Sequence, residues 1–309
     1  MEIREFTFAD LDAFAVAHRQ AFDFNLNIGD YIFKSAFGSE RQIVLARIAV
    51  ESDSIVSFYG VYKCSLINGS GNVINGAQSG DTLTVKSHRG QGLFVRLARE
   101  VYNLCPAFCI DFVFGIPSDS SSGIFKNKLS WHMSQQIMSY RQFVPTIPIS
   151  LFVNNFLFRR VYRMYVNLIL KFYKNGKPFS RKSSGIFNYV IHRNEDFWKS
   201  KLGREGVYLK KISGCDVIFK LKEGRLMIGD VDCSNELELK KVMKSICSLS
   251  ALLGCNIVNF YFSDKSEFSE YSFFSHVKQG LPLGFLPLNE ALLDVKIDLN
   301  LTFLDFDTF

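Results

Sequence analysis

The residues best placed to do chemistry form one short turn, Ser87-His-Arg-Gly-Gln-Gly92. The alternation of Thr82–Val85 before it predicts a half-buried strand, and the apolar spacing from Phe94 to Leu104 predicts a helix after it. A turn between a strand and the start of a helix directs several backbone N–H groups, and the positive end of the helix dipole, at one point. Its glycines would admit a bulky anion, and its arginine would add a charged donor. The pattern therefore predicts a phosphate-binding turn, and the alternative is a turn that serves only the fold.

This turn resembles motif A of the GCN5-related N-acetyltransferase (GNAT) superfamily, Gln/Arg-x-x-Gly-x-Gly/Ala. Arg89, Gly90 and Gly92 match that motif, whereas Ser87 departs from it at the first position. Two later segments also resemble the family, in the family's order: Phe108–Pro117 resembles its next strand, and Phe125–Trp131 resembles its following short helix. The resemblance covers roughly residues 1–144.

The resemblance implies a donor substrate, acetyl-CoA or another acyl-CoA. No metal is expected, because the cysteines form no C-x-x-C pair and no histidine stands at ligand spacing. Its pyrophosphate would lie on the backbone of the turn and the first helical residues, which are Arg89, Gly90, Gln91, Gly92, Leu93 and Phe94. The family's central strand separates from the next one and binds the pantetheine arm, which here implies Leu83, Thr84 and Val85. Backbone N–H groups at that edge would also stabilise the oxyanion that forms when an amine attacks a thioester.

Amine attack requires a base, because only the neutral amine is a nucleophile. Asp81, two residues before Leu83, is the first candidate, and the alternative is that it caps a turn. His132, just after Trp131, is the second candidate. The family often has a tyrosine as general acid five residues before that aromatic, but Lys126 stands there, so the proton donor to the leaving thiolate stays open.

The elements around the turn are predicted in the order that a GNAT domain requires. We expect a strand over residues 2–7 and helices from Asp10 to Phe22 and near Asp30–Phe37. Strands are expected over Gln42–Val50 and Ile55–Leu66, followed by the strand that leads to the turn.

The rest of the chain is predicted to form a connector and a second unit. Residues 145–185 contain a predicted basic helix, Asn155–Asn175, which would either connect two folded parts or lie on a membrane surface. Residues 186–309 weakly repeat the order of strands and helices that is predicted for the first domain. They predict a hairpin over Cys215–Val231, a helix ending at Gly254, a strand over Ile257–Phe262, a short helix and closing turn at Phe273–Leu286, and a strand-like tail from Leu301.

In this second unit, acidic residues replace the glycine turn, namely Asp230, Asp232, Glu236 and Glu238. They would repel a pyrophosphate, so we expect one cofactor site. The predicted fold is α/β (α+β): a GNAT fold with a mixed, mostly antiparallel twisted sheet flanked by helices, plus a second, degenerate GNAT-like unit. The predicted domains are residues 1–144, the acyl-CoA-binding domain; 145–185, the connector; and 186–309, the degenerate unit.

Composition and charge limit the possible partners. The chain has 309 residues and a net charge of +6, and residues 120–194 hold twelve Lys and Arg but no acidic residue. Such a region suggests an anionic partner: a phosphorylated small molecule, a lipid headgroup or RNA. The seven scattered cysteines, the lack of an export signal and the lack of an apolar run of about 18 residues predict reduced thiols in the cytoplasm.

Two-unit GNAT proteins of this size resemble enzymes that acylate amino sugars linked to nucleotides for bacterial surface polysaccharides. The resemblance implies transfer of an acetyl or other short acyl group to a dTDP- or UDP-linked amino sugar, by a monomer or homodimer without nucleic-acid binding or stable membrane insertion. The alternatives are acetylation of another small amine or peptide, a Fem-like aminoacyl transferase that uses charged tRNA, and a binding protein that keeps only the fold.

Overall fold

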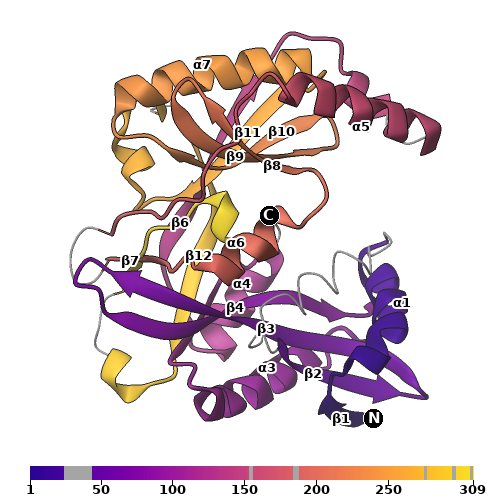
Figure 1. Cartoon of the computed structure of the whole chain (residues 1–309). Coiled ribbons are helices and arrows are strands. Elements are labelled where there is room, and N and C mark those ends of the chain that lie inside the picture. The colour runs from indigo at the N-terminus through magenta and orange to yellow at the C-terminus, as the bar shows by residue number, and fades with distance from the viewer. Residues whose placement is uncertain (24–43, 153–155, 184–187, 275–276, 294–296, 307–308) are drawn as a thin grey trace. The chain divides into compact units, whose positions relative to one another are not determined.

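The computed structural model describes residues 1–23, 44–152, 156–183, 188–274, 277–293, 297–306 and 309 (Figure 1). The helix predicted near residues 30–37 lies outside them. The chain forms two compact units. Unit 1 comprises residues 1–135, 183–192 and 281–298, and unit 2 comprises residues 136–182, 193–280 and 299–309.

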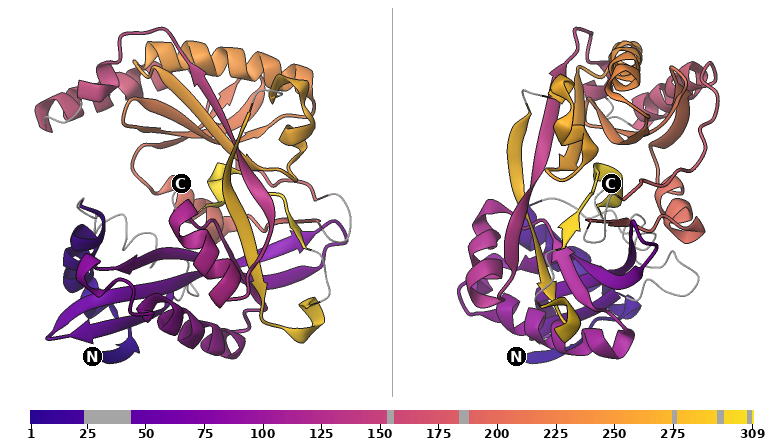
Figure 2. Two further views of the ribbon diagram at one scale, coloured as in Figure 1. Left: turned by 180° about the vertical axis from the view of Figure 1, so that it is seen from behind. Right: turned by 90° about the vertical axis from the view of Figure 1, so that its left-hand side faces the viewer.

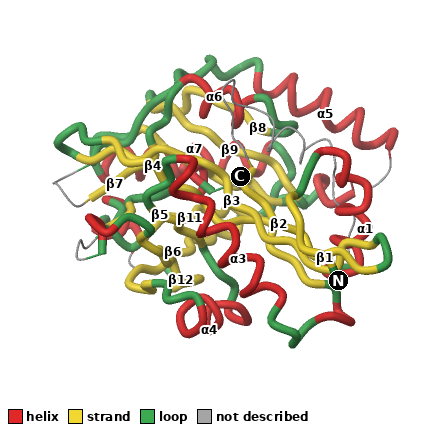
Figure 3. The backbone as a smooth tube through the Cα atoms, turned by 90° about the horizontal axis from the view of Figure 1, so that it is seen from below, coloured by secondary structure: helices red, strands yellow, loops and turns green. Residues whose placement is uncertain are grey.

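The sheet of unit 1 begins as four successive antiparallel strands and continues with a parallel one. The four are β1 (Glu2–Glu5), β2 (Val44–Glu51), β3 (Ser54–Asn68) and β4 (Val73–Thr84). The fifth, β5 (Phe112–Gly115), is parallel to β4, and β7 (Asn188–Ile191) pairs with β3. The helices are α1 (Leu11–Phe22), α3 (Leu93–Leu104) and α4 (Asp119–Lys128). Helix α3 lies along the sheet and contacts β2 and β3 (Figure 3).

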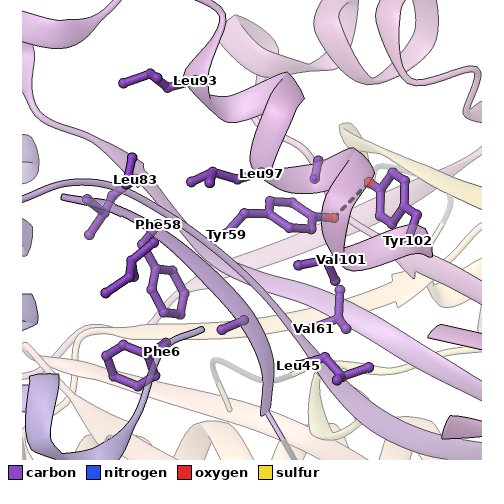
Figure 4. Packing of buried hydrophobic residues seen from close by; sticks show 14 of the residues in the cluster. Phe6, Leu45, Phe58, Tyr59, Val61, Leu83, Leu93, Leu97, Val101 and Tyr102 are labelled. Atoms are coloured by element: carbon purple, nitrogen blue, oxygen red, sulfur yellow. Dashed lines mark hydrogen bonds between the residues drawn. The ribbon is translucent and has the colours of Figure 1, made fainter. Parts of the chain in front are cut away.

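Aromatic and aliphatic side chains between α3 and the sheet form the core of unit 1 (Figure 4). The helix directs Leu97 and Val101, both fully buried, toward the strands, as its predicted apolar face requires. The core also contains hydroxyl groups. The Tyr59 and Tyr102 hydroxyls are 2.8 Å apart, and the indole N–H of Trp131 donates to Tyr102 at 3.1 Å. These bonds satisfy polar atoms that would otherwise be costly to bury.

Unit 2 repeats the strand and helix order of unit 1. Strands β8 (Val207–Ile212), β9 (Cys215–Lys222) and β10 (Arg225–Asp232) are antiparallel neighbours, α7 (Glu236–Leu252) follows, and β11 (Ile257–Ser263) is parallel to β10. This is the order of β2, β3, β4, α3 and β5. The predicted hairpin, helix and strand of the second unit are therefore confirmed, and so is the fold class.

Unit 2 also contains helix α5 (Phe156–Leu170) and helix α6 (Glu195–Leu202). Helix α5 ends five residues earlier than predicted, although backbone bonds of the helical type continue to Tyr173. In the described part of the chain, no helix is both long and apolar enough to cross a membrane.

The chain passes between the units more often than three consecutive domains would allow. Strand β6 (His132–Phe143) starts in unit 1 and pairs with β11 in unit 2. Strand β12 (Lys278–Pro287) starts in unit 2 and pairs with β5 in unit 1. The short helix and closing turn predicted over Phe273–Leu286 were therefore wrong beyond a 3₁₀ turn, because most of that segment is β12. The predicted connector, residues 145–185, is not a separate unit either. Its residues up to 182 belong to unit 2, and the segment that begins at 183 belongs to unit 1.

In the described part of the C-terminal tail, the predicted strand is reduced to one isolated antiparallel bridge between Thr302 and Phe262, and the strand prediction was wrong beyond it. The tail forms a 3₁₀ turn over Phe303–Asp305. The Asp305 carboxylate accepts a hydrogen bond from the Thr302 backbone N–H at 2.8 Å and forms bonds of 2.9 and 3.0 Å with the Arg193 guanidinium. These buried bonds decide the conformation against the weak alternation of the sequence.

Candidate functional site

The glycine turn connects β4 to α3 and is exposed at Arg89–Gly92. Gly90 and Gly92 have φ angles of +82° and +76°, and an added Cβ at either would meet no atom within 4 Å. The left-handed backbone explains both glycines, and the open space leaves room for a ligand. Gly92 is the N-cap of α3, so no side chain at that position caps the helix, and the first helical turn contains no acidic residue. An anion could therefore approach these backbone N–H groups.

Side chains around the turn hold it in place. The Arg89 guanidinium donates to the carbonyl oxygens of Ala21, at 2.9 Å, and Thr84, at 3.2 Å. The Nε2 of His88 lies 2.9 Å from a carboxylate oxygen of Glu51, and this hydrogen bond lowers the pKa of Glu51. Arg89 thus ties the turn to the end of α1, whereas the sequence suggested that its side chain would bind the anion. Ser87, the departure from the motif, contacts Nδ1 of His88 at 2.8 Å.

Strand β4 loses one neighbour just before the turn. It pairs with β5 over Gly76–Gln78, but β5 ends at Gly115 while β4 continues to Thr84. In the described part of the chain, the later residues of β4 therefore have no partner from β5. This open edge is where the sequence placed the pantetheine contacts.

Two of the three predicted contact residues at this edge have buried side chains, and some of their backbone groups already have hydrogen-bond partners. Leu83 and Val85 are 2% and 4% exposed. The Leu83 carbonyl accepts a hydrogen bond from the Ser57 hydroxyl at 3.0 Å. Contacts to a donor substrate at Leu83 and Val85 would thus be backbone contacts, and the Val85 N–H already donates to the Val56 carbonyl at 2.9 Å. Thr84, the third predicted contact residue, is half-buried.

A β-bulge deforms β4 beside the open edge. Phe58 pairs with Leu83 and Gly60 with Gly80, so two residues of β4 lie opposite one residue of β3. One of the two, Asp81, has a φ angle of 53°, in the left-handed region that non-glycine residues rarely adopt. The Tyr62 hydroxyl from β3 donates a hydrogen bond to the Asp81 carboxylate. Strain of this kind is retained where surrounding contacts over-determine it, and it is common at functional sites.

The second base candidate, His132, and Lys126, which stands where the family often has a tyrosine, lie on separate elements of unit 1. His132 is exposed at the start of β6, and its ring stacks on Phe285 with centroids 5.3 Å apart. Lys126 is exposed on α4. The structure therefore gives Asp81 a fixed environment beside the open edge and gives His132 a packing contact.

Sequence reasoning missed the tyrosines that surround the bulge. Tyr62, only 5% exposed, contacts Asp81, and Tyr59 lies opposite the bulge within the buried hydroxyl cluster with Tyr102 and Trp131. Burial raises the pKa of Tyr59 and Tyr102, so both stay protonated at physiological pH. For Tyr59 and Tyr62, the only signal in the sequence was that both lie in the stretch predicted as a strand from its apolar residues.

The corresponding place in unit 2 is closed by the protein itself. Asn235 is the N-cap of α7, its side chain accepts from the Glu238 N–H at 3.0 Å, and the Glu238 carboxylate accepts from the Ser234 N–H at 2.9 Å. Both side chains thus accept hydrogen bonds from backbone N–H groups at the start of α7, whereas no side chain caps the start of α3. The neighbouring bulge of β10 contains Gly229, where an added Cβ would lie 2.5 Å from the ring of Phe309.

Asp230 does not act as the exposed repelling charge that the sequence suggested. It is fully buried and forms ion pairs with Arg181, at 2.9 Å, and Arg193, at 2.7 Å. Two of the twelve basic residues in the acid-free region therefore neutralise a buried acid. The absence of a glycine turn in unit 2 is better explained by the capped start of α7 than by repulsion.

The arrangement in unit 1 can bind an anion on backbone N–H groups beside a strand edge that carries a carboxylate. In the described residues, no group of three or more His, Cys, Asp or Glu side chains is arranged to hold a metal ion.

Solved acetyltransferase structures resemble the chain over nearly its whole length. A GCN5-related N-acetyltransferase from Kribbella flavida is 12% identical, with a TM-score of 0.56 over 93% of this chain and 72% of that one. A probable N-acyltransferase from Enterococcus faecalis V583 is 10% identical, with a TM-score of 0.59 over 95% and 74%. A putative acetyltransferase from Pyrococcus horikoshii is 10% identical, with a TM-score of 0.55 over 98% and 92%.

Comparison with models of protein families and with curated proteins found no match. At such low identities the structural likeness establishes the fold. Within the chain, unit 2 repeats the strand and helix order of unit 1 and has a bulge in the equivalent strand, but it lacks the glycine turn. The chain therefore has the fold of the GCN5-related N-acetyltransferases.

Proposed function

We propose that the chain is an acyl-CoA-dependent N-acyltransferase with its donor site in unit 1. The observation that carries this proposal is the coincidence of two features: the open start of α3, and the edge of β4 that has no partner from β5 in the described part of the chain. The first suits a pyrophosphate and the second suits an extended amide-containing arm. The fold of the similar structures supports the same assignment.

In this proposal the pyrophosphate accepts hydrogen bonds from the backbone of residues 89–94, and the arm lies along residues 83–85. The thioester carbonyl then lies near the bulge, where backbone N–H groups stabilise the charge that develops on its oxygen. Asp81 accepts a proton from the attacking amine. A C–N bond forms, the C–S bond breaks, and the thiolate of coenzyme A leaves and takes up a proton.

Tyr62 acts as a positioning residue in this scheme. Its hydrogen bond fixes the Asp81 carboxylate, and its ring is buried, so the carboxylate keeps one orientation. His132 remains the alternative base. Its exposure would allow proton exchange with solvent, whereas its ring stacks on Phe285 and is held there by packing.

The proposed acceptor is an amino sugar linked to a nucleotide. The support is the acid-free basic region, although the structure reduces the number of cations that could serve it. Arg181 and Arg193 are buried in ion pairs, and Arg163 pairs with Glu205. Exposed lysines of the same region remain as candidates for a diphosphate, and within unit 1 these include Lys126 and Lys128 of α4. Each hydrogen bond to a charged phosphate would contribute about 1.5–3 kcal/mol.

Thermal unfolding with acetyl-CoA tests the donor site. A site of micromolar affinity should gain about 4 kcal/mol of stability when the ligand is a thousandfold above its dissociation constant. No shift with acetyl-CoA or with coenzyme A would contradict donor binding and favour a protein that keeps only the fold.

Release of free thiol in a panel of acceptors tests the acceptor class. Nucleotide-linked amino sugars should be acylated, more slowly as salt rises, and the free amino sugars should have a kcat/KM lower by several orders of magnitude. Fast, salt-insensitive acylation of a free amine or a peptide would assign the enzyme to another small-amine or peptide acetyltransferase. Activity only with charged tRNA would assign it to the Fem-like class.

A further inference from the structure

Helix α5 has two apolar faces, of which only one is covered by unit 2. Val166 and Leu170 are 1% and 2% exposed and belong to the core of the unit. The Tyr162 hydroxyl anchors the same face by donating to the Leu253 carbonyl at 2.8 Å. One covered face is enough to explain why the helix forms.

The second face remains exposed. Val161, Met164, Leu168 and Phe172 recur at intervals of three and four residues, so they lie on one side of the helix and its last turn. Their exposed fractions are 61%, 70%, 56% and 83%. We call these four side chains the outer face of α5; the helix itself lies at the margin of unit 2 (Figure 2). A contiguous apolar face of this kind is unusual on a protein surface that contacts only water.

Basic side chains lie beside the outer face. Arg160 precedes Val161 directly, and Lys171 follows Leu168 by three positions. Both side chains are exposed, and both lie on the side of the helix away from the buried Val166. The sequence has no acidic residue from 120 to 194, so nothing on this helix balances these charges. The helix thus presents an apolar stripe bordered by a positive one.

We propose that the outer face of α5 docks on an anionic lipid surface. The apolar stripe would enter the boundary between headgroups and acyl chains, and Arg160 and Lys171 would contact the negative headgroups. The helix would lie in the plane of the surface. This proposal does not depend on the acyl-transfer activity, and it uses other cations than the lysines assigned to the acceptor.

Charge favours a lipid surface over a second copy of the chain. Two α5 helices packed outer face to outer face in the antiparallel sense would bring two positive borders together, and like charges repel. In the parallel sense each border would lie on its own side of the pair without an acidic residue of α5 to face it. An anionic bilayer complements both stripes at once, because it offers negative headgroups next to an apolar layer.

Co-sedimentation of the full chain with vesicles tests the proposal without any substitution. Binding should be strong to vesicles that contain phosphatidylglycerol, weak to pure phosphatidylcholine vesicles, and reduced by salt. Absence of binding to the anionic vesicles, or equal binding to both kinds, would overturn the proposal.

Two pairs of substitutions then locate the contact. Met164→Ser with Leu168→Ser should lower the vesicle partition coefficient about tenfold or more, because the apolar stripe is lost. Arg160→Gln with Lys171→Gln should lower it about fivefold for each charge removed and should weaken its salt dependence. All four side chains are exposed, and far-UV circular dichroism with thermal unfolding would check that the variants fold.

Matched controls come from α7, which belongs to the same unit. Leu237 is 64% exposed there, and Lys241 and Lys244 are exposed as well. Leu237→Ser and the pair Lys241→Gln with Lys244→Gln should leave vesicle binding unchanged. Equal losses in these controls would overturn the assignment to α5.

Sedimentation velocity tests whether a second copy of the chain, instead of a lipid surface, covers the outer face. The proposal would be overturned if the original chain formed a dimer but did not bind vesicles, and if that dimer disappeared in the Met164→Ser, Leu168→Ser variant. That result would assign the outer face to a second copy.

Discussion

The Tyr62 hydroxyl donates a hydrogen bond to the Asp81 carboxylate within the β4 bulge. Tyr62 is 5% exposed, and Asp81 holds a left-handed backbone with φ of 53°. A buried donor and a strained backbone together limit the carboxylate to few orientations. A group that must accept a proton from a bound amine benefits from such a limit, because proton transfer requires a defined geometry.

Asp81→Asn should keep the shape of the bulge and remove the base. We expect turnover to fall about a hundredfold or more, the usual effect of losing a general base. Activity should recover in part at high pH, where the acceptor amine loses its proton without help. The check is a pH profile of thiol release for both proteins. A variant with an unchanged rate at every pH would transfer the role to His132 or to a water molecule.

Tyr62→Phe should remove the hydrogen bond and keep the ring. We expect a smaller fall in kcat than for Asp81→Asn, with an unchanged KM for acetyl-CoA, because the donor site does not include the hydroxyl. Tyr189, another buried tyrosine of unit 1, provides the control. If Tyr189→Phe lowered kcat as much as Tyr62→Phe, the effect would be a general loss of packing.

Gly92→Asp should abolish coenzyme A binding and leave the fold intact. The substitution places a carboxylate where the pyrophosphate is proposed to lie, at a position with open space for a Cβ. Gly71 is a close match, since its φ is +82° and an added Cβ would also meet no atom within 4 Å. Gly71→Asp should therefore carry a similar backbone strain, of about 1 kcal/mol, without loss of binding. Calorimetry that showed equal affinity for both variants would contradict the placement of the donor.

Calorimetric titration should also give one coenzyme A per chain. The start of α3 is open, whereas Asn235 and Glu238 close the start of α7. Gly92→Asp should reduce the stoichiometry from one to zero. A residual site in that variant would show that unit 2 binds the coenzyme despite its capped helix.

Asp305→Asn should destabilise the chain strongly. Asp305 is 5% exposed and forms two hydrogen bonds with the buried Arg193. Its loss leaves Arg193 with Asp230 as its remaining carboxylate in the described residues, and Asp230 also pairs with Arg181. Breaking a buried pair of this kind costs about 3–5 kcal/mol. Glu195→Gln removes the partner of Lys199 from an exposed ion pair and should have little effect. Urea unfolding followed by circular dichroism would compare the two, and equal midpoints would show that the buried pair contributes no more than the exposed one.

The amino-acid sequence by itself determined the elements whose causes are local. The strand, glycine turn and helix from Thr82 to Leu104 were predictable because apolar periodicity and left-handed glycines act over a few residues. The hairpin of β9 and β10 and the helix α7 followed for the same reason. The cap of α7 was also readable as Asn235-x-x-Glu238, although the residues around it suggested electrostatic repulsion instead.

Only the tertiary structure decided which distant residues meet. Tyr62 reaches Asp81 because β3 pairs with β4 in one register, and a different register would turn the side chain elsewhere. Arg193 and Asp305, 112 residues apart, form a buried pair that no local pattern announces. The same holds for β12, which passes from unit 2 to unit 1 and pairs there with the edge of β5. Local patterns specify a strand or a helix, but the choice of partner depends on packing and on pairing buried charges, which involve the whole chain.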